Sequence, residues 1–351
     1  MSIVVKLGSS LVANERGRVR RGLLEARATE IGTLVRGREQ VCVVSSGAIA
    51  LGLPGLGLER RPRSTPQLQA ASAVGQVRLQ LAWRAALKAQ GLEAAQILLS
   101  AGDLAERVSY VNARNALKAL LRLGVVPVVN ENDATATDEI TFGDNDSLAA
   151  QVAMLLGARL LVLLTEVDGV YSSHPADADA RPVASGDALE GVRLGAGSIQ
   201  GKGGMASKVA SARLAATAGI PTVIASGRGT DVLAAIVAGE GRGTRFTAAA
   251  SPASAFRLWL RYAKPPSGRL VLDDGARAAV AKEGRSLLAV GVVSCEGSFV
   301  PGDAVELVAL DGTVIGKGLA GAGAAELRDR PRGLEAVHRD RLVLFESAQT
   351  S

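Results

Sequence analysis

Aromatic residues are scarce in this chain: Phe, Trp and Tyr make up only 3% of its 351 residues, although 48% of the chain is hydrophobic. The core must therefore be built from Val, Leu, Ile and Ala, the usual filling of a parallel sheet packed under helices. Cysteine is also rare, and Cys42 and Cys295 lie far apart, each within an apolar strand-like run. This usage argues against a disulfide framework and fits a reducing compartment.

Long apolar runs and a polycationic segment are also missing. No apolar run reaches the length of a membrane span, and the chain begins with a strand pattern instead of a secretion signal, so we expect a soluble cytoplasmic protein with no membrane association. The net charge is +6, yet the part from Phe256 onward carries 13 basic and 12 acidic residues and the rest carries 27 and 22. Charge alone is therefore a poor argument for nucleic-acid binding.

The order of apolar patterns indicates the fold class. A chain of this length favours two domains. Up to about residue 250, buried-strand patterns alternate with helical patterns, which predicts an α/β fold: a three-layer αβα sandwich with a mainly parallel open sheet. The expected strands cover 3–7, 41–44, 94–99, 125–129, 160–164 and 222–225, and the expected helices cover 22–36, 67–89, 108–123 and 147–156.

A linker of small residues, 248–254, separates this region from a different pattern. Short strands follow it at 291–294, 303–308, 313–315 and 342–345, and Asp311 with Gly312 is typical of a hairpin turn between two of them. We therefore predict one domain over residues 1–250 and a small β-rich, partly open barrel over 256–351.

Polar residues gather where several of the expected strands end. Lys6 and Gly8 close the first strand, Ser45 and Ser46 close the second, and residues 130–133 add four consecutive acidic or amide groups after the fourth. A single such ending is explained by a tight turn, and Lys6 alone could be a solubilising residue on an edge strand. Several endings together favour a ligand site, because open α/β sheets bind ligands at the carboxyl ends of their strands.

Two later segments add charge to this edge. In residues 142–147, Asp144 and Asp146 lie two apart and Ser147 is well suited to cap the following helix, so the segment is either a carboxylate cluster or a plain capping turn. A Gly-rich turn with Lys202 and Lys208 then leads into another helix, which favours polyphosphate binding although its spacing is not that of a P-loop. The first strand is followed by no GxGxxG motif, which excludes an ordinary dinucleotide site.

Lysines, Gly-rich N–H groups and carboxylates at one sheet edge are the components of phosphoryl transfer. Catalysis of that reaction depends on positioning and on neutralising the charge of the transferred group. Lys6 and Lys208 could hold the phosphates from both sides, and an aspartate between them could fix their ammonium groups. The protein would need no nucleophile of its own.

These motifs also resemble, in their order and spacing, those of the glutamate 5-kinase family within the amino acid kinase superfamily. The resemblance rests on residues 6–9, 45–50, 130–133, 142–146 and 203–205 with Lys208. The tail resembles a PUA domain, through Trp259 and residues 268–270, 274–276, 286–288 and 297–299.

The resemblance implies an ATP-dependent kinase that phosphorylates the side-chain carboxylate of L-glutamate to L-glutamyl 5-phosphate, the first step of proline synthesis. It implies catalytic roles for Lys6, Asp146 and Lys208. Glutamate would be bound by Ser46, Gly47, Asp133 and Asn145. ATP would be bound by Lys6, Gly8, Thr165, Glu166, Lys202, Gly203, Gly204, Met205, Ala206, Ser207 and Lys208. It further implies Mg²⁺ near Asp144, inhibition by proline and a homo-oligomer, either a dimer or a tetramer.

Three residues depart from the family pattern: Glu166 where Asp is usual, Lys202 where Thr is usual, and His174 where an acid or amide commonly precedes Pro175. All three concern the nucleotide side, and Lys202 either adds a phosphate contact or points to solvent. A sister kinase acting on another carboxylate or carbamate stays open as an alternative, as does an RNA-binding factor acting through the PUA-like tail.

Overall fold

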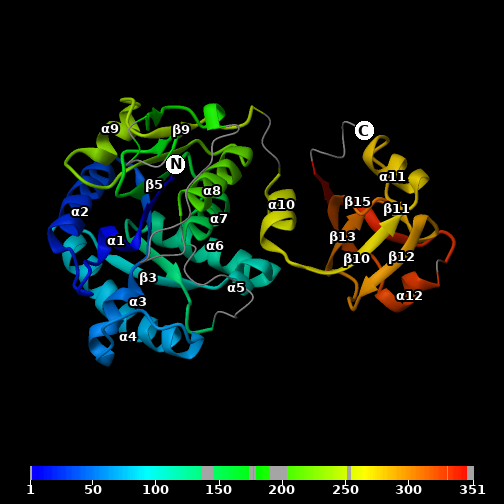
Figure 1. Ribbon diagram of the computed structural model, residues 1–351, viewed down its shortest axis with the longest axis horizontal. Helices are drawn as coiled ribbons and strands as arrows, with labels where there is room; N and C mark the ends of the chain where they lie inside the picture. The colour runs from blue at the N-terminus through cyan, green and yellow to red at the C-terminus, as the bar shows by residue number, and fades with distance from the viewer. Residues whose placement is uncertain are drawn as a thin grey trace. The chain divides into compact units, whose positions relative to one another are not determined.

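The computed structural model describes residues 2–135, 145–173, 177, 179–189, 204–250, 254–329 and 331–345 (Figure 1). The chain divides into two compact units, Met1–Pro252 and Ala253–Ser351, which are considered separately. Among the helices within these ranges, none is both long enough and apolar enough to span a bilayer.

The first unit is organised by a seven-stranded sheet in the order β3-β4-β2-β1-β5-β8-β9. Its strands are β1 Ser2–Leu7, β2 Gln40–Ser45, β3 Ala94–Leu99, β4 Val126–Glu131, β5 Leu160–Thr165, β8 Thr222–Ser226 and β9 Thr244–Phe246. The first six are parallel, and β9 alone runs antiparallel, along β8. The predicted parallel sheet is confirmed, although the sequence patterns missed β9, which has only three residues.

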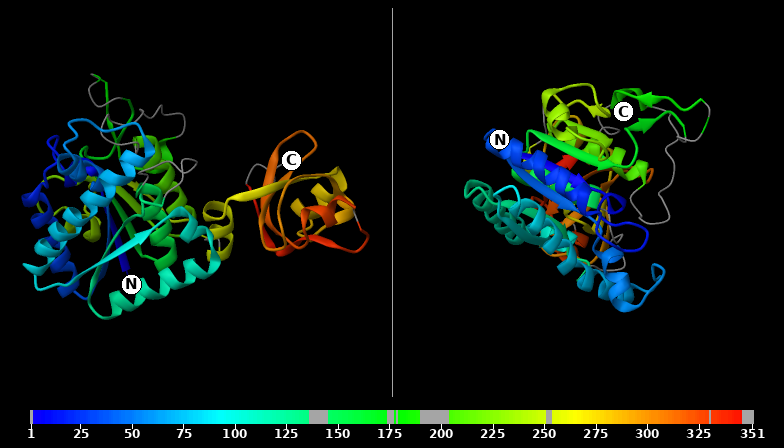
Figure 2. Two further views of the ribbon diagram at one scale, coloured as in Figure 1. Left: turned by 90° about the horizontal axis from the view of Figure 1, so that it is seen from below. Right: turned by 90° about the vertical axis from the view of Figure 1, so that its left-hand side faces the viewer.

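Helices cover both faces of this sheet, so the predicted three-layer αβα sandwich is also confirmed (Figure 2). One face carries α2 Arg21–Arg36, α4 Thr65–Lys88 and α9 Val232–Ala238, and the other carries α6 Arg107–Arg122, α7 Asn145–Leu156 and α8 Met205–Thr217. Ile3, Val5 and Leu7 share one core cluster with α2, α4 and α9. Side chains alternate along a strand, so Lys6 must face the layer of α7 and α8.

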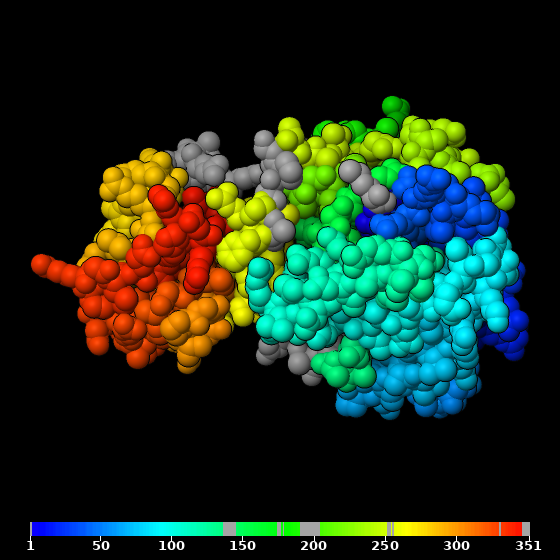
Figure 3. All heavy atoms as spheres, turned by 180° about the vertical axis from the view of Figure 1, so that it is seen from behind, coloured from blue at the N-terminus to red at the C-terminus, as the bar shows by residue number. Residues whose placement is uncertain are grey.

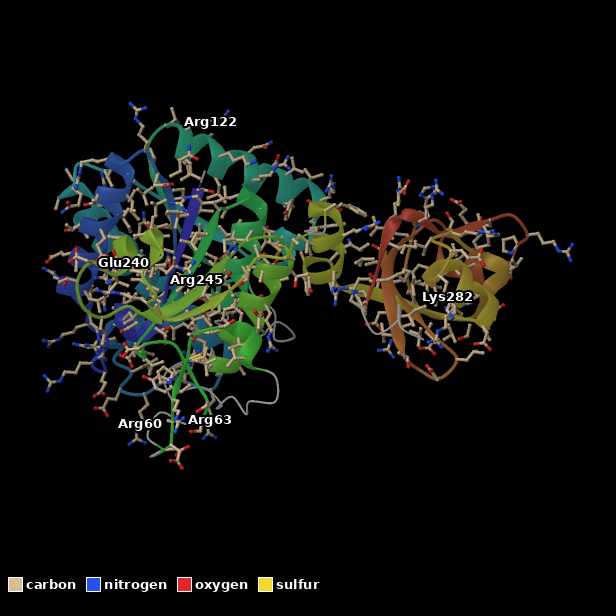
Figure 4. All side chains as sticks on the ribbon, turned by 90° about the horizontal axis from the view of Figure 1, so that it is seen from above. Arg60, Arg63, Arg122, Glu240, Arg245 and Lys282 are labelled. Carbon is tan, nitrogen blue, oxygen red and sulfur yellow. The ribbon has the colours of Figure 1, made fainter. Side chains whose placement is uncertain are left out.

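Shorter elements complete the first unit. They are the α-helices α1 Ser9–Val12, α3 Ala48–Gly52 and α5 Ala101–Ala105, the 3₁₀ helices η1 Leu53–Leu56 and η2 Gly186–Leu189, and the strands β6 Val170–Tyr171 and β7 Pro182–Val183. Helix α6 lies on the surface in the teal area of Figure 3. Arg60 and Arg63, from the loop before α4, lie at the periphery (Figure 4).

The expected cap at Ser147 is wrong. Helix α7 begins at Asn145, which makes Ser147 its third residue. The helix starts earlier because Asp146 is buried in its first turn, where a carboxylate is favoured by the helix dipole.

The second unit contains a six-stranded sheet in the order β11-β15-β14-β13-β10-β12, the predicted PUA-like β module. Its strands are β10 Pro266–Leu272, β11 Leu287–Leu288, β12 Val292–Gly297, β13 Ala304–Val308, β14 Val314–Ala320 and β15 Glu335–Leu344. Its helices are the α-helices α10 Ala255–Leu258, α11 Asp274–Ala281 and α12 Ala324–Arg328, the π-helix η3 Trp259–Ala263 and the 3₁₀ helix η4 Ala289–Gly291. Asp311 and Gly312 join β13 to its antiparallel partner β14, as predicted. Strand β10 was missed because Pro266, Ser267 and Gly268 weaken its pattern.

Helices α3 and α4 approach so closely that two glycines are required at their contact. A Cβ atom on Gly75 would lie 1.8 Å from the carbonyl oxygen of Ala48, and one on Gly52 would lie 1.7 Å from that of Ala71. This contact holds α3 directly after Ser46 and Gly47, at the carboxyl end of β2.

Gly75→Ala is therefore expected to lower the free energy of unfolding by about 1–3 kcal/mol, because backbone atoms would have to move apart. Gly22→Ala is the matched control, since Gly22 lies in α2 with open space around it. The control should be neutral or stabilising by up to about 1 kcal/mol. Urea unfolding of both variants measures the difference, and equal effects would contradict the close packing.

Candidate functional site

Lys6, Asp146 and Lys208 meet at the carboxyl edge of the sheet, each from a different element. Lys6 Nζ lies 2.6 Å from Asp146 Oδ1, and Lys208 Nζ lies 3.0 Å from Asp146 Oδ2. All three residues are buried. Lys6 extends from the end of β1, while Asp146 and Lys208 lie in the first turns of α7 and α8, which pack against each other.

The two ammonium groups determine the charge state of Asp146. Burial by itself would raise the pKa of this carboxyl, but Lys6 and Lys208 outweigh that effect and hold the pKa below its ordinary value. Asp146 is therefore an ionised bridge between two cations. Such a bridge fixes both ammonium groups at the edge where a ligand would enter.

A second group of predicted residues lies around β2, β4 and the start of α7. Ser46 donates its backbone N–H to the carbonyl of Leu7, at 3.1 Å, and Gly47 turns the chain into α3 with φ of +112°. Asp133 follows β4 and is buried, as is Asn145 at the start of α7. The predicted residues Ser46, Gly47, Asp133 and Asn145 therefore all lie at ends of elements on this edge.

Helix α4 supplies two polar residues to the site that the sequence motifs do not include. Ser72 donates a hydrogen bond from Oγ to Asp133 Oδ2, at 2.5 Å, and Gln76 Oε1 accepts one from Asn130 Nδ2, at 2.8 Å. Ser72 and Gln76 are one turn apart, so they lie on the same helix face. In the sequence, the only signal for them is the i, i+4 spacing of two polar residues on a largely apolar helix face, and this spacing does not indicate what they contact.

Several buried polar atoms in this region have no hydrogen-bond partner within the described ranges. They are Asp133 Oδ1, Asn145 Oδ1, Asn130 Oδ1 and Gln76 Nε2. Buried polar groups nearly always find a partner, so this set is suited to a polar ligand.

The charge of Asp133 is set by its surroundings. Burial raises the pKa of Asp133, and the hydrogen bond from Ser72 and the charge of half-buried Arg61 oppose that rise. Arg61 belongs to the loop before α4, which contains none of the sequence motifs assigned to a ligand.

The predicted nucleotide residues within the described ranges lie at the same edge. Gly8 precedes α1 and Gly204 precedes α8, whose first turn contains Met205, Ala206 and Ser207. Thr165 ends β5, and its carbonyl accepts the N–H of Gly227 at 2.7 Å. Glu166 pairs with Arg228, with Oε1 2.6 Å from Nη2. The predictions for Asp144, His174, Lys202 and Gly203 lie outside the described residues.

Asp146→Asn is expected to lower the free energy of unfolding at pH 7 by about 3–5 kcal/mol, because two buried lysines lose their counter-charge. The folded pKa of Asp146 lies below the unfolded value of about 3.9, so its pairing stabilises the fold above about pH 4 and is lost as the pH falls through the folded pKa. The variant should lack this acid-dependent loss.

Urea unfolding at a series of pH values measures both effects. Glu240→Gln is the control, because Glu240 is exposed, and it should retain the acid dependence of the wild-type protein. An unchanged acid dependence in Asp146→Asn would contradict the role of the bridge.

Known proteins are similar in sequence to this chain over nearly its whole length. Residues 1–226 match the model of the amino acid kinase family, and residues 268–340 match that of the PUA domain. The chain is 43% identical to a glutamate 5-kinase of Methylobacillus flagellatus and 44% identical to one of Chromobacterium violaceum, each over 97% of both chains. A glutamate 5-kinase of Bordetella parapertussis is 45% identical over 97% of this chain and 96% of its own.

A solved isopentenyl phosphate kinase is similar in fold to most of this chain. It aligns with a TM-score of 0.51 and 22% identity, over 70% of this chain and 100% of its own. The sequence relatives go further than this likeness of fold, because they match the chain across both units at more than 40% identity. The chain therefore belongs to the glutamate 5-kinase family, with an amino acid kinase fold followed by a PUA domain.

Proposed function

We propose that the protein transfers the terminal phosphoryl group of ATP to the side-chain carboxylate of L-glutamate and so forms L-glutamyl 5-phosphate, the first step of proline biosynthesis. Membership of a kinase family supports the use of ATP. The observation that carries the proposal is the convergence of Lys6 and Lys208 on the single buried carboxylate of Asp146. Two fixed cations at a ligand-binding edge are what a migrating phosphoryl group requires.

In this mechanism Lys6 and Lys208 contact the phosphates and stabilise negative charge as the phosphoryl group moves. An ammonium group has three N–H donors, which allows contacts to phosphate oxygens besides the contact to Asp146. Asp146 holds both ammonium groups in place, so little reorganisation is needed during transfer. The substrate carboxylate is the nucleophile, and the protein forms no covalent intermediate.

Ser46, Gly47, Asp133 and Asn145 hold glutamate in this proposal. The carboxylate of Asp133 suits the substrate's ammonium group, and Ser72 orients that carboxylate through its hydrogen bond. The unpartnered oxygens of Asp133 and Asn145 would then gain partners from the substrate.

ATP would lie against Lys6, Gly8, Thr165, Glu166, Lys202, Gly203, Gly204, Met205, Ala206, Ser207 and Lys208. Helix α8 would direct its N-terminal end toward the phosphates. No cluster of three metal-ligating side chains occurs among the residues whose positions are described. Mg²⁺ binds proteins through one or two carboxylates and nucleotide phosphates. Asp144 would be such a ligand, and the ion would neutralise phosphate charge.

The remaining features of the proposal concern the whole protein. Residues 1–250 would form the catalytic domain and residues 256–351 the PUA-like domain, in a cytoplasmic homo-oligomer, either a dimer or a tetramer. Proline would inhibit by competing for the glutamate site. RNA binding by the second domain is the alternative role, but its nearly balanced charge gives that role no support.

The purified protein is expected to form an acyl phosphate from ATP and L-glutamate in the presence of Mg²⁺, detected by trapping with hydroxylamine. Aspartate, N-acetylglutamate and carbamate are the competing substrates. Turnover of one of these without product from glutamate would reject the proposed substrate and favour a sister kinase.

Lys208→Ala should reduce kcat by about 10²–10³, because a cation that stabilises the transferred group is removed. Lys118→Ala on the exposed side of α6 is the control and should keep wild-type kinetics. Circular dichroism and a thermal melt establish that both variants are folded. Wild-type turnover in folded Lys208→Ala would remove the charge role of this lysine.

A further inference from the structure

An ion pair on α2 reaches across to the loop that follows β8. Arg27 is fully buried, and its guanidinium lies 2.7 Å from Glu30 Oε1. The same guanidinium donates to the carbonyl of Gly227 at 3.4 Å and to that of Gly229 at 2.6 Å. Glu30 accepts the backbone N–H groups of Val232 at 3.1 Å and Leu233 at 2.7 Å. The pair therefore binds the loop formed by residues 227–231 at Gly227 and Gly229, and it also binds the first turn of α9, which follows the loop.

This loop has a conformation that needs support. Gly229 has φ of +91°, and Asp231 has φ of +56°, a left-handed conformation that a residue with a side chain seldom adopts. Such a conformation persists only where the surrounding contacts enforce it. Arg27 provides such a contact at Gly229, and Glu30 provides two directly after Asp231, at Val232 and Leu233.

The other side of the loop touches the residues assigned to the nucleotide. Gly227 donates its N–H to the carbonyl of Thr165 at 2.7 Å, and the guanidinium of Arg228 pairs with Glu166 at 2.6 Å. A pocket of about 270 Å³ opens beside these contacts. Its lining includes Asp168, Ser226, Arg228 and Arg242. Movement of the loop would therefore displace one wall of this pocket and the partner of Glu166.

A contribution to the stability of the fold does not by itself explain a buried Arg27–Glu30 ion pair. Burying an arginine and a glutamate costs desolvation free energy, and apolar residues of similar size often serve stability equally well. Burial lowers the pKa of Arg27, against the opposing charges of Glu30 and Asp231. The pair makes four contacts to backbone, two to the 227–231 loop and two to the first turn of α9 that follows it, which points to a geometric role.

We propose that Arg27 and Glu30 are positioning residues for the nucleotide site: they hold the 227–231 loop so that Arg228 keeps Glu166 and the adjoining pocket wall in place for ATP. The sheet separates this pair from Lys6, Asp146 and Lys208, because α2 and α9 cover the opposite face from α7 and α8. Because of this separation, kcat should be spared. The effect should fall on ATP because the loop contacts Thr165 and Glu166, whereas the residues assigned to glutamate lie at the ends of β2 and β4 and at the start of α7. This inference rests on the proposed kinase function.

The test compares steady-state kinetics of Arg27→Lys and Glu30→Gln with the wild-type protein. Each should raise KM for ATP about tenfold, equivalent to about 1.4 kcal/mol, since lysine cannot reproduce the forked donors of arginine. KM for glutamate and kcat should stay within about twofold of wild type. Titration with a non-hydrolysable ATP analogue should show the same weakening as a dissociation constant.

Arg159→Lys and Glu39→Gln are the matched controls. Arg159 and Glu39 form an ion pair of the same residue types, with Nη2 2.5 Å from Oε1, but this pair is only partly buried and lies before β5 and β2 at the amino edge of the sheet. These variants should lower the melting temperature without changing KM for ATP. An Arg27→Lys variant that behaves in the same way would overturn the proposal.

Arg228→Ala makes the test independent of the buried pair, because Arg228 is exposed and its loss should not prevent folding. It should raise KM for ATP to a similar extent, and an unchanged KM would overturn the proposal even if Arg27→Lys fails to fold. The proposed function fails separately, if the wild-type protein makes no glutamyl phosphate. The analogue titration would still support or overturn the positioning role in that case.

Discussion

The site depends on one buried carboxylate that is shared by two ammonium groups from separate elements. Asp146 would be costly to bury alone, and so would Lys6 and Lys208, but together they leave a single positive charge near the sheet edge. This requirement ties the end of β1 to the first turns of α7 and α8. The central strand and the two helices must therefore pack correctly before the site exists.

The parallel sheet explains how distant segments serve one site. All six parallel strands present their carboxyl ends at one edge, so residues from 6 to 228 can meet there. Because successive side chains of a strand point to opposite faces of the sheet, the helix layers on the two faces contribute different residues to the site. Lys6 turns toward α7 and α8, whereas Ser72 and Gln76 approach from α4, and Arg27 with Glu30 supports the 227–231 loop from α2.

Some expectations drawn from sequence were wrong or incomplete, for physical reasons that can be named. Ser147 is a good capping residue, but α7 starts two residues earlier, with Asp146 in its first turn, where the helix dipole favours a carboxylate. Strands β9 and β10 were missed, one because it is short and the other because Pro and Gly weaken its pattern. Ser72 and Gln76 were missed because a polar residue within a helix gives no sign of its partner in a distant strand.

The sequence by itself determined the fold class and the chemistry available at the site. Apolar runs ending in Gly, Ser, Asn or Lys are local features, and local features are sufficient to predict buried parallel strands with a polar carboxyl edge. Only the tertiary structure decided which residues share a charge. Asp146 lies 140 residues from Lys6 and 62 from Lys208, and Arg27 lies 202 from Gly229. Such pairings depend on how strands are ordered and how helices are packed, which no local pattern in the chain specifies.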